Sequence, residues 1–149
     1  MKRPLQVKPL SEQAFAPYGK VLRRDLEGEL FQPLHTETQH EGWRVAILQI
    51  QPGPLARIHR HPDSEECFSP LTGSPCIAVA EAHEPESICI FQLSEPVCVN
   101  RNVWHELVAD VTATVFIAEN ALISGESLPQ DPAVHWKNQK KINLTKTDL

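Results

Sequence analysis

Short apolar runs separated by turn-forming residues dominate the middle of the chain. The runs are rich in valine and isoleucine, and each has about the length of a β-strand. Turn formers such as Pro52-Gly53 and the segment 72–75 separate them. The runs lie at residues 43–52, 56–62, 66–71, 76–82, 87–93, 96–100, 104–110 and 113–120. Runs at this spacing, roughly 8–12 residues, are typical of a β-sandwich or barrel and not of alternating βαβ units.

The segments before and after these runs follow other patterns. Residues 11–19 predict one short helix, with Ser11 as its N-cap and Gly19 at its end. Residues 28–41 are polar and aperiodic, so we expect a long loop over one end of the barrel. Beyond Asn120 the chain has scattered proline and lysine and no clear period, which predicts a tail that wraps the surface or frays.

We therefore expect a single domain over residues 1–149. Its expected parts are an N-terminal strand, helix and loop (1–42), a barrel core (43–120) and a loosely packed C-terminal tail (121–149). A chain of 149 residues with 41% hydrophobic and 22% charged residues has the composition of an ordinary globular domain.

Charge and composition narrow the range of partners. The net charge of −5 argues against nucleic acid as a partner, because phosphate binding needs a basic face. No apolar run approaches membrane-spanning length, and the N-terminus lacks the apolar stretch of a signal peptide. We expect a cytoplasmic protein that binds neither nucleic acid nor membrane.

Cysteine usage agrees with this expectation. The chain has four cysteines within apolar runs and no CxxC pair, the spacing typical of zinc ribbons and redox motifs. They are Cys67, Cys76, Cys89 and Cys98. We interpret them as buried free thiols in a reducing compartment.

A cluster of possible metal ligands follows the first turn. Side chains alternate along a strand, so His59 and His61 lie on the same face, about 6.6 Å apart along it. Two such imidazoles converge on one ion if a neighbouring strand supplies a third ligand. The turn that follows His61 can bring Glu66 onto such a neighbour, and His105 lies after another turn. The alternative is that these are surface or hydrogen-bonded core histidines.

The predicted ion is one divalent transition metal. Three imidazoles and one carboxylate suit Fe, Mn, Ni, Cu or Zn, and nothing in the sequence chooses among them. We retain Ni, Mn, Fe and Zn as the candidates.

The spacing of these residues resembles the first motif of the cupin superfamily. Gly53, five residues, His59-x-His61, four residues, Glu66, six residues and Gly73 reproduce that motif. The second motif is partly present, because His105 keeps its place although Asn102 stands where a glycine is usual. The resemblance implies an all-β, cupin-type double-stranded β-barrel, or jelly roll.

Three longer segments resemble the ureidoglycolate lyase family, once called ureidoglycolate hydrolases. They are LQVKPLSEQAFAPYGKVL (5–22), RHPDSEECFSPLTG (60–73) and VNRNVWHELVADVTATVFIAEN (99–120). In the family pattern a Glu is usual at the position of His59, a Gln at Glu66 and a second His at Glu106. The first two departures bring the chain closer to the general cupin metal set.

This resemblance implies an enzyme of purine or allantoin catabolism that releases urea and glyoxylate from ureidoglycolate, a small carboxylate-bearing substrate. Two arginines are candidates for binding the carboxylate: Arg57 shares the parity of His59, and Arg101 lies within a family segment. The candidates for proton transfer are Glu65, His35 and His40. Strand alternation would aim Glu65 away from Glu66, which is an objection to it.

Two other functions remain open at this point. One is a metal-dependent cupin enzyme of another class, an isomerase or a dioxygenase, and the other is a non-catalytic cupin that binds a small ligand. We also expect a homodimer, because cupins commonly pair and twofold dimers are the commonest oligomers.

Overall fold

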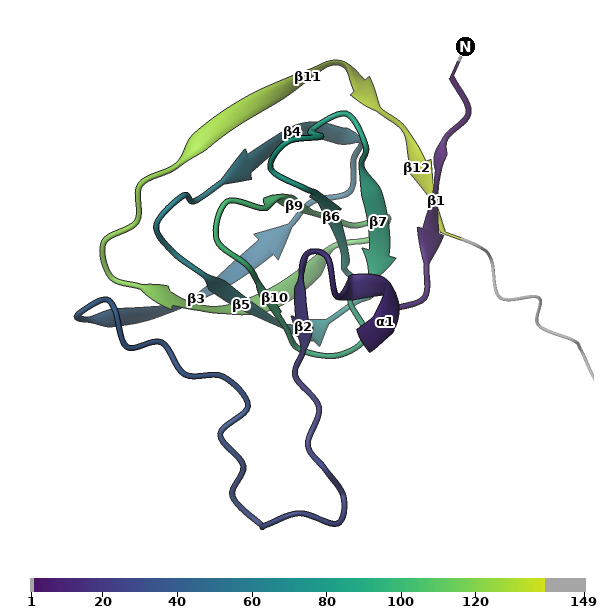
Figure 1. The fold of residues 1–149 in the computed structure, drawn as a ribbon. Helices are drawn as coiled ribbons and strands as arrows, with labels where there is room; N and C mark the ends of the chain where they lie inside the picture. The colour runs from purple at the N-terminus through teal and green to yellow at the C-terminus, as the bar shows by residue number, and fades with distance from the viewer. Residues whose placement is uncertain (1, 139–149) are drawn as a thin grey trace, which may run out of the picture.

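The computed structural model describes residues 2–138, which fold into an almost entirely β structure (Figure 1). The first elements are β1 (Leu5–Lys8), α1 (Glu12–Phe15), β2 (Gly19–Val21), β3 (Trp43–Ile50), β4 (Leu55–Arg60) and β5 (Glu66–Thr72). They are followed by β6 (Cys76–Ala80), β7 (Cys89–Gln92), β8 (Val97–Val99), β9 (Trp104–Val108), β10 (Ala113–Asn120), β11 (Glu126–Val134) and β12 (Trp136–Lys137). Within residues 2–138, no helix is long and apolar enough to cross a membrane.

The strands form two sheets that make a nearly closed barrel. One sheet has seven strands in the order β11-β4-β9-β6-β7-β1-β12, and the other has five in the order β2-β8-β5-β10-β3. All the strands expected between residues 43 and 120 are present, so the predicted all-β barrel is confirmed. The predicted short helix is also confirmed, and the Ser11 side chain accepts a hydrogen bond from the Ala14 amide at 3.1 Å, as an N-cap should.

An apolar core lies between the sheets. Its largest members are aromatic: Phe15 is fully buried, its ring meets that of Phe91 edge-on at 5.5 Å, and Phe68 extends the core toward β5. This core ends near the start of β5 and β9, where polar residues replace apolar ones on the inward face.

The expectation of an irregular C-terminal tail is wrong for residues 126–137. Strand β11 pairs antiparallel with β4, and β12 pairs parallel with β1. Arg60 of β4 contacts the strands on both sides of it. Its guanidinium lies 2.8 Å from Glu126 of β11 and 4.4 Å from the centre of the Trp104 ring of β9. Strand β11 was not predicted because it contains two prolines and few apolar residues. An edge strand tolerates both. The rest of the predicted tail, residues 139–149, lies outside the described residues.

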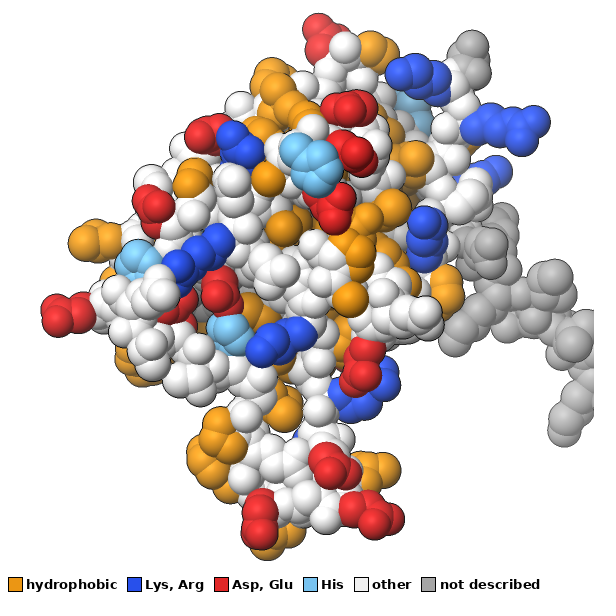
Figure 2. All heavy atoms as spheres, in the orientation of Figure 1, with side chains coloured by type: hydrophobic (Ala, Val, Ile, Leu, Met, Phe, Trp, Pro, Cys, Tyr) orange, Lys and Arg blue, Asp and Glu red, His pale blue; other side chains and the backbone are white. Residues whose placement is uncertain are grey.

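A long segment without helix or strand connects β2 to β3, which confirms the predicted loop at 28–41. Its tip projects away from the barrel (Figure 1) and carries exposed Leu26, Leu30 and Phe31 beside acidic residues (Figure 2). Its second half is held to the barrel by Arg101, which donates hydrogen bonds to Gln39 at 2.6 Å and to Glu37 at 2.5 Å.

Two glycines allow a matched test of this packing. A Cβ at Gly19 would lie 1.9 Å from the carbonyl oxygen of Cys98 on the paired strand β8, whereas a Cβ at Gly53 would meet nothing within 4 Å. We expect Gly19→Ala to lower the free energy of unfolding by about 1–3 kcal/mol, as overpacking does. Gly53→Ala should change it by less than about 0.5 kcal/mol. Urea unfolding of both variants checks this, and equal midpoints would contradict the tight β2–β8 contact.

Candidate metal centre

Three neighbouring segments bring the four predicted metal ligands together. His59 lies in β4, directly opposite His105 in β9, and His61 follows two residues after His59. Glu66 opens β5. One possible ligand atom from each of the four residues lies within 4.8 Å of all the others.

Each of the histidines has an oxygen close to its Nδ1 atom. The carbonyl oxygen of Ser124 lies 2.9 Å from Nδ1 of His61, and that of Val103 lies 2.9 Å from Nδ1 of His105. The carboxylate of Glu106 lies 3.4 Å from Nδ1 of His59. The acceptors at Nδ1 of His61 and His105 favour the tautomer with its proton there, which leaves Nε2 free as a ligand, whereas Nδ1 of His59 has no well-formed hydrogen bond.

The Nε2 atoms of His61 and His105 face the carboxylate of Glu66. Nε2 of His61 contacts Oε1 of Glu66, and Nε2 of His105 lies 3.5 Å from the same oxygen. Nevertheless, Oε1 of Glu66 and Nε2 of His105 are buried atoms without a well-formed hydrogen bond. Buried polar atoms in this condition are costly, and a cation between them would remove the cost. Both the donor set and its geometry therefore fit a divalent transition metal.

The charges around the centre shift its pKa values. Burial would raise the pKa of Glu66, but the imidazoles of His105 and His61 outweigh it and hold that pKa well below its usual range. Burial lowers the pKa of His61, but Glu66 outweighs it and raises the pKa overall. Burial likewise opposes ionisation of Glu106, yet His59 brings its net pKa below the usual value. The two carboxylates are therefore ionised at neutral pH and suited to bind a cation.

The centre is open on one side only. The side chains of His59 and His61 are 24% and 14% exposed, whereas those of Glu66 and His105 are 5% and 3% exposed. The ring of Phe68, part of the apolar core, backs His105 at 5.7 Å between ring centres. His59 and His61 are therefore the members of the centre in contact with solvent, and Glu66 and His105 are the enclosed ones.

A further carboxylate beside the centre, in addition to Glu66 and Glu106, was not predicted from the sequence. Glu119 of β10 is the cross-strand neighbour of Glu66, and Arg44 of β3 lies on its other side with Nε 2.6 Å from its carboxylate. Burial raises the pKa of Glu119, Arg44 opposes this rise, and the negative charge of Glu66 adds to it, so the net pKa lies above its usual range. Both strands were predicted, but the sequence does not show which residues face each other across them.

The other predicted site residues lie around the centre or away from it. Arg57 is exposed and donates to the carboxylate of Glu106 at 3.2 Å. His35 and Glu65 contact each other at 2.5 Å. Arg101 holds the long loop, as described above. His40 is exposed on that loop. It belongs neither to the centre nor to the group of possible ligands that His35 and Glu65 form with Cys98.

A cavity at another place in the described part of the chain does not coincide with this chemistry. It has a volume of about 810 Å³ and is lined by segments such as Pro52–Pro54 and His135–Asn138, without any residue of the centre. A smaller cavity of about 380 Å³ lies between the long loop and Glu65. We identify the site by its converging ligand atoms, since volume alone points elsewhere.

A β-barrel that holds three histidines and a glutamate at one end, on the Gly53–Gly73 spacing, is a cupin barrel. A solved structure of a dTDP sugar isomerase from Desulfovibrio desulfuricans G20 has the same fold, with a TM-score of 0.54 and 17% identity over 76% of this chain and 83% of that one.

Relatives of known name define the family more closely. A ureidoglycolate lyase from Rhizobium etli is 31% identical over 68% of this chain and 74% of its own length. One from Azotobacter vinelandii is 30% identical over 69% and 75%, and ureidoglycolate lyase 2 from Rhizobium meliloti is 29% identical over 74% and 81%. A comparison with models of protein families found no match. The chain belongs to the ureidoglycolate lyase family.

Proposed function

We propose that this protein is a metal-dependent lyase that splits ureidoglycolate into urea and glyoxylate, in the breakdown of purines through allantoin. The observation that carries the proposal is the convergence of His59, His61, His105 and Glu66 at the open end of a barrel whose named relatives are ureidoglycolate lyases. The free cysteines suit a reducing compartment, and we infer that the protein acts in the cytoplasm.

The reaction requires a proton to leave one atom of the substrate and another to reach a second atom. Ureidoglycolate carries a carboxylate, a hydroxyl and a ureido nitrogen on one carbon. As the hydroxyl loses its proton, the carbon–oxygen bond becomes the carbonyl of glyoxylate, the carbon–nitrogen bond breaks, and the nitrogen gains a proton to give urea. A divalent ion held by the four ligands would polarise the carboxylate and hydroxyl of the substrate.

The substrate carboxylate needs a cation at the open side of the centre. Arg57 lies there, on the same strand as His59, and its side chain is 62% exposed, so it can turn toward a bound carboxylate. Arg101 also remains a prediction for this role, although its guanidinium is already engaged by the long loop.

Proton transfer to the leaving nitrogen needs a group that is protonated before the reaction and lies near the centre. Glu119 lies near the centre as the cross-strand neighbour of Glu66, its side chain is only 10% exposed, and burial raises its pKa above the usual range. We therefore add Glu119 to the candidates. Glu65 and His35 were predicted for the same role, but they contact each other and Glu65 has the parity of the outward face of the sheet, so they are weaker candidates than Glu119. His40 stays a prediction.

Removal of a metal ligand tests the core of the proposal. Wild-type protein, purified without chelator or affinity tag, should bind Ni, Mn, Fe or Zn and release urea and glyoxylate without consuming oxygen. His61→Ala should bind one equivalent less metal and lose at least about 100-fold in kcat/KM. The substitution removes a metal ligand together with the contact that orients it, between its Nδ1 and the carbonyl oxygen of Ser124. Metal analysis and a glyoxylate assay on the same samples give both values.

Two results would contradict this function. Turnover by protein that stays metal-free after incubation with all four ions would make the cluster an acid–base site. Metal-bound protein that consumes oxygen, or that leaves ureidoglycolate unchanged, would place it in another class of cupin enzyme. His83→Ala is the matched control, because that histidine is 72% exposed and lies outside the centre.

Glu119→Gln tests the proposed acid separately from the metal. The variant keeps the shape of the side chain and should keep its metal, but kcat should fall by about 10²–10⁴-fold, the usual worth of a general acid. Glu65→Gln, measured in parallel, shows whether the carboxylate before β5 contributes. An unchanged kcat in Glu119→Gln would remove Glu119 from the mechanism.

We also propose a homodimer, in which strand β3 of each copy is covered by the other. β3 is an edge strand that pairs with β10 alone within residues 2–138. Three of its apolar side chains, Trp43, Val45 and Ile47, alternate onto one face and are 76%, 50% and 66% exposed. An edge strand with exposed apolar side chains is a site for association. A second copy of the chain would bury these side chains symmetrically.

Sedimentation at micromolar concentration tests the dimer. Wild-type protein should sediment as a dimer, and the double variant Trp43→Glu/Ile47→Glu should sediment as a monomer with an intact far-ultraviolet spectrum. Val111→Glu, which changes an equally exposed apolar residue on another strand connection, should remain a dimer. A monomeric wild type would refute the proposal.

A further inference from the structure

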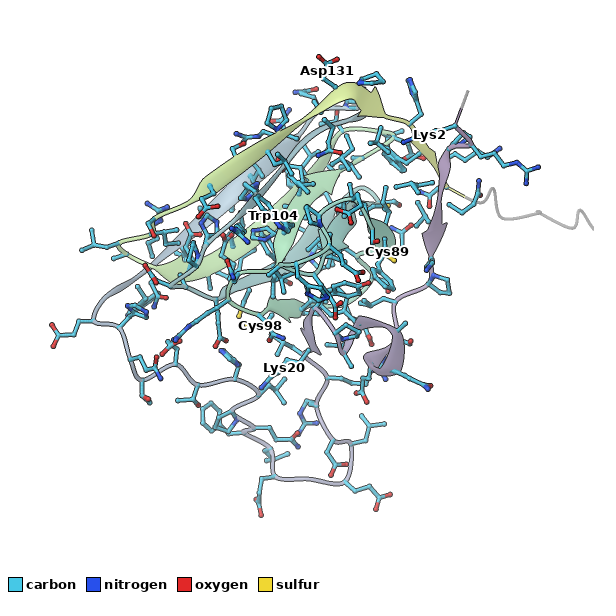
Figure 3. The ribbon with its side chains drawn as sticks, turned by 45° about the horizontal axis from the view of Figure 1, so that its top comes forward. Lys2, Lys20, Cys89, Cys98, Trp104 and Asp131 are labelled. Atoms are coloured by element: carbon cyan, nitrogen blue, oxygen red, sulfur yellow. The ribbon has the colours of Figure 1, made fainter. Side chains whose placement is uncertain are left out.

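A second group of ligand-type side chains lies beside the long loop. His35 belongs to the loop, Glu65 immediately precedes β5, and Cys98 lies in β8. One possible ligand atom from each lies within 4.8 Å of the other two. Figure 3 shows Cys98 at the side of the barrel that faces the loop. The group thus joins three segments that are distant in sequence.

This group lies on the opposite face of the sheet from the candidate metal centre. Glu66 points inward, so Cys67 points outward, and Cys98 shares that outward face because it pairs directly with Cys67 across β5 and β8. Glu65 has the same parity as Cys67. The two groups share no residue, and the five-stranded sheet separates them.

The three side chains converge on one carboxylate oxygen. Nε2 of His35 lies 2.5 Å from the carboxylate of Glu65, and Sγ of Cys98 lies 3.6 Å from the same oxygen. Both ring nitrogens of His35 are buried atoms without a well-formed hydrogen bond. Buried polar atoms without a hydrogen bond are costly, and a cation bound by the ring would remove that cost.

We propose that His35, Glu65 and Cys98 bind a thiophilic divalent ion of the zinc class, with Cys67 as the fourth ligand. Zinc takes this mixture of sulfur, nitrogen and oxygen donors in a tetrahedron, with bonds of about 2.0–2.3 Å. Cys67 is within reach because directly opposed residues have Cβ atoms roughly 4.5–5.5 Å apart. Binding displaces the thiol protons, so the ion replaces protons rather than adding net charge to the barrel.

The ion would attach the long loop to the barrel. His35 is the loop's ligand, whereas the other three ligands belong to or adjoin the five-stranded sheet. Without the ion, Arg101 supplies the described side-chain hydrogen bonds between this half of the loop and the barrel. This role is structural and does not depend on the proposed lyase activity.

Cobalt absorption separates the two sites, because the candidate metal centre contains no sulfur ligand. Reduced, tag-free protein titrated with Co²⁺ should develop a near-ultraviolet thiolate-to-cobalt charge-transfer band. Cys98→Ser should weaken this band, since Cys67 remains as a thiolate ligand, and Cys67→Ser/Cys98→Ser should lose it, while His105→Ala, which disables only the inner centre, should keep it. Cys89→Ser is the control, since Cys89 is, like Cys67, a half-buried thiol but lies on a different strand.

A loop variant keeps the test valid if Cys98→Ser does not fold. His35→Ala changes a residue outside all strands and should weaken Co²⁺ binding at the sulfur site by at least about 10-fold. Zn²⁺ should also slow trypsin cleavage after the exposed Arg24 in wild type but not in His35→Ala. Absence of the charge-transfer band in reduced wild type, or its persistence in Cys67→Ser/Cys98→Ser, would overturn the proposal.

Discussion

The pairing of His59 with His105 across β4 and β9 is the constraint on which the candidate metal centre depends. It places two imidazoles 4.4 Å apart between ring centres before any ligand binds. The alternation of β4 adds His61 on the same face, and the start of β5 supplies Glu66. A shift of one residue in this pairing would turn His105 out of the centre, so barrel register and site geometry are the same property.

Because the centre is largely buried, its histidines need hydrogen-bond partners at Nδ1 as well as a partner at Nε2. The carbonyl oxygens near Nδ1 of His61 and His105 set the orientations of these two rings, and the buried Nε2 of His105 and Oε1 of Glu66 then have few partners other than each other. Glu106 illustrates how a departure from the family pattern is absorbed. Its carboxylate lies 3.4 Å from Nδ1 of His59 and accepts a hydrogen bond from Arg57, so a position where the family has a second histidine here supports one of the ligands.

Local patterns in the sequence predict most of the fold and the four ligands of the candidate metal centre. The barrel strands, the capped helix, the long loop and the grouping of His59, His61, Glu66 and His105 follow from apolar runs, turn residues and spacing. What could not be read depends on contacts between distant segments. Strand β11 carries prolines and polar residues that only an edge position tolerates, and the place of Glu119 beside Glu66 depends on strand register.

The rings of His61 and His105 are oriented with Nδ1 toward backbone carbonyls and Nε2 toward the carboxylate of Glu66, and the candidate metal centre depends on this orientation. Long-range ¹⁵N–¹H NMR of the imidazole side chains in chelator-treated protein tests it most directly, because the two nitrogens have distinct shifts in each tautomer. We expect the Nδ1–H form for neutral His61 and His105, and on addition of Zn²⁺ a shift of the Nε2 signals alone. Nε2–H tautomers, or rings that average rapidly and do not respond to zinc, would contradict the account.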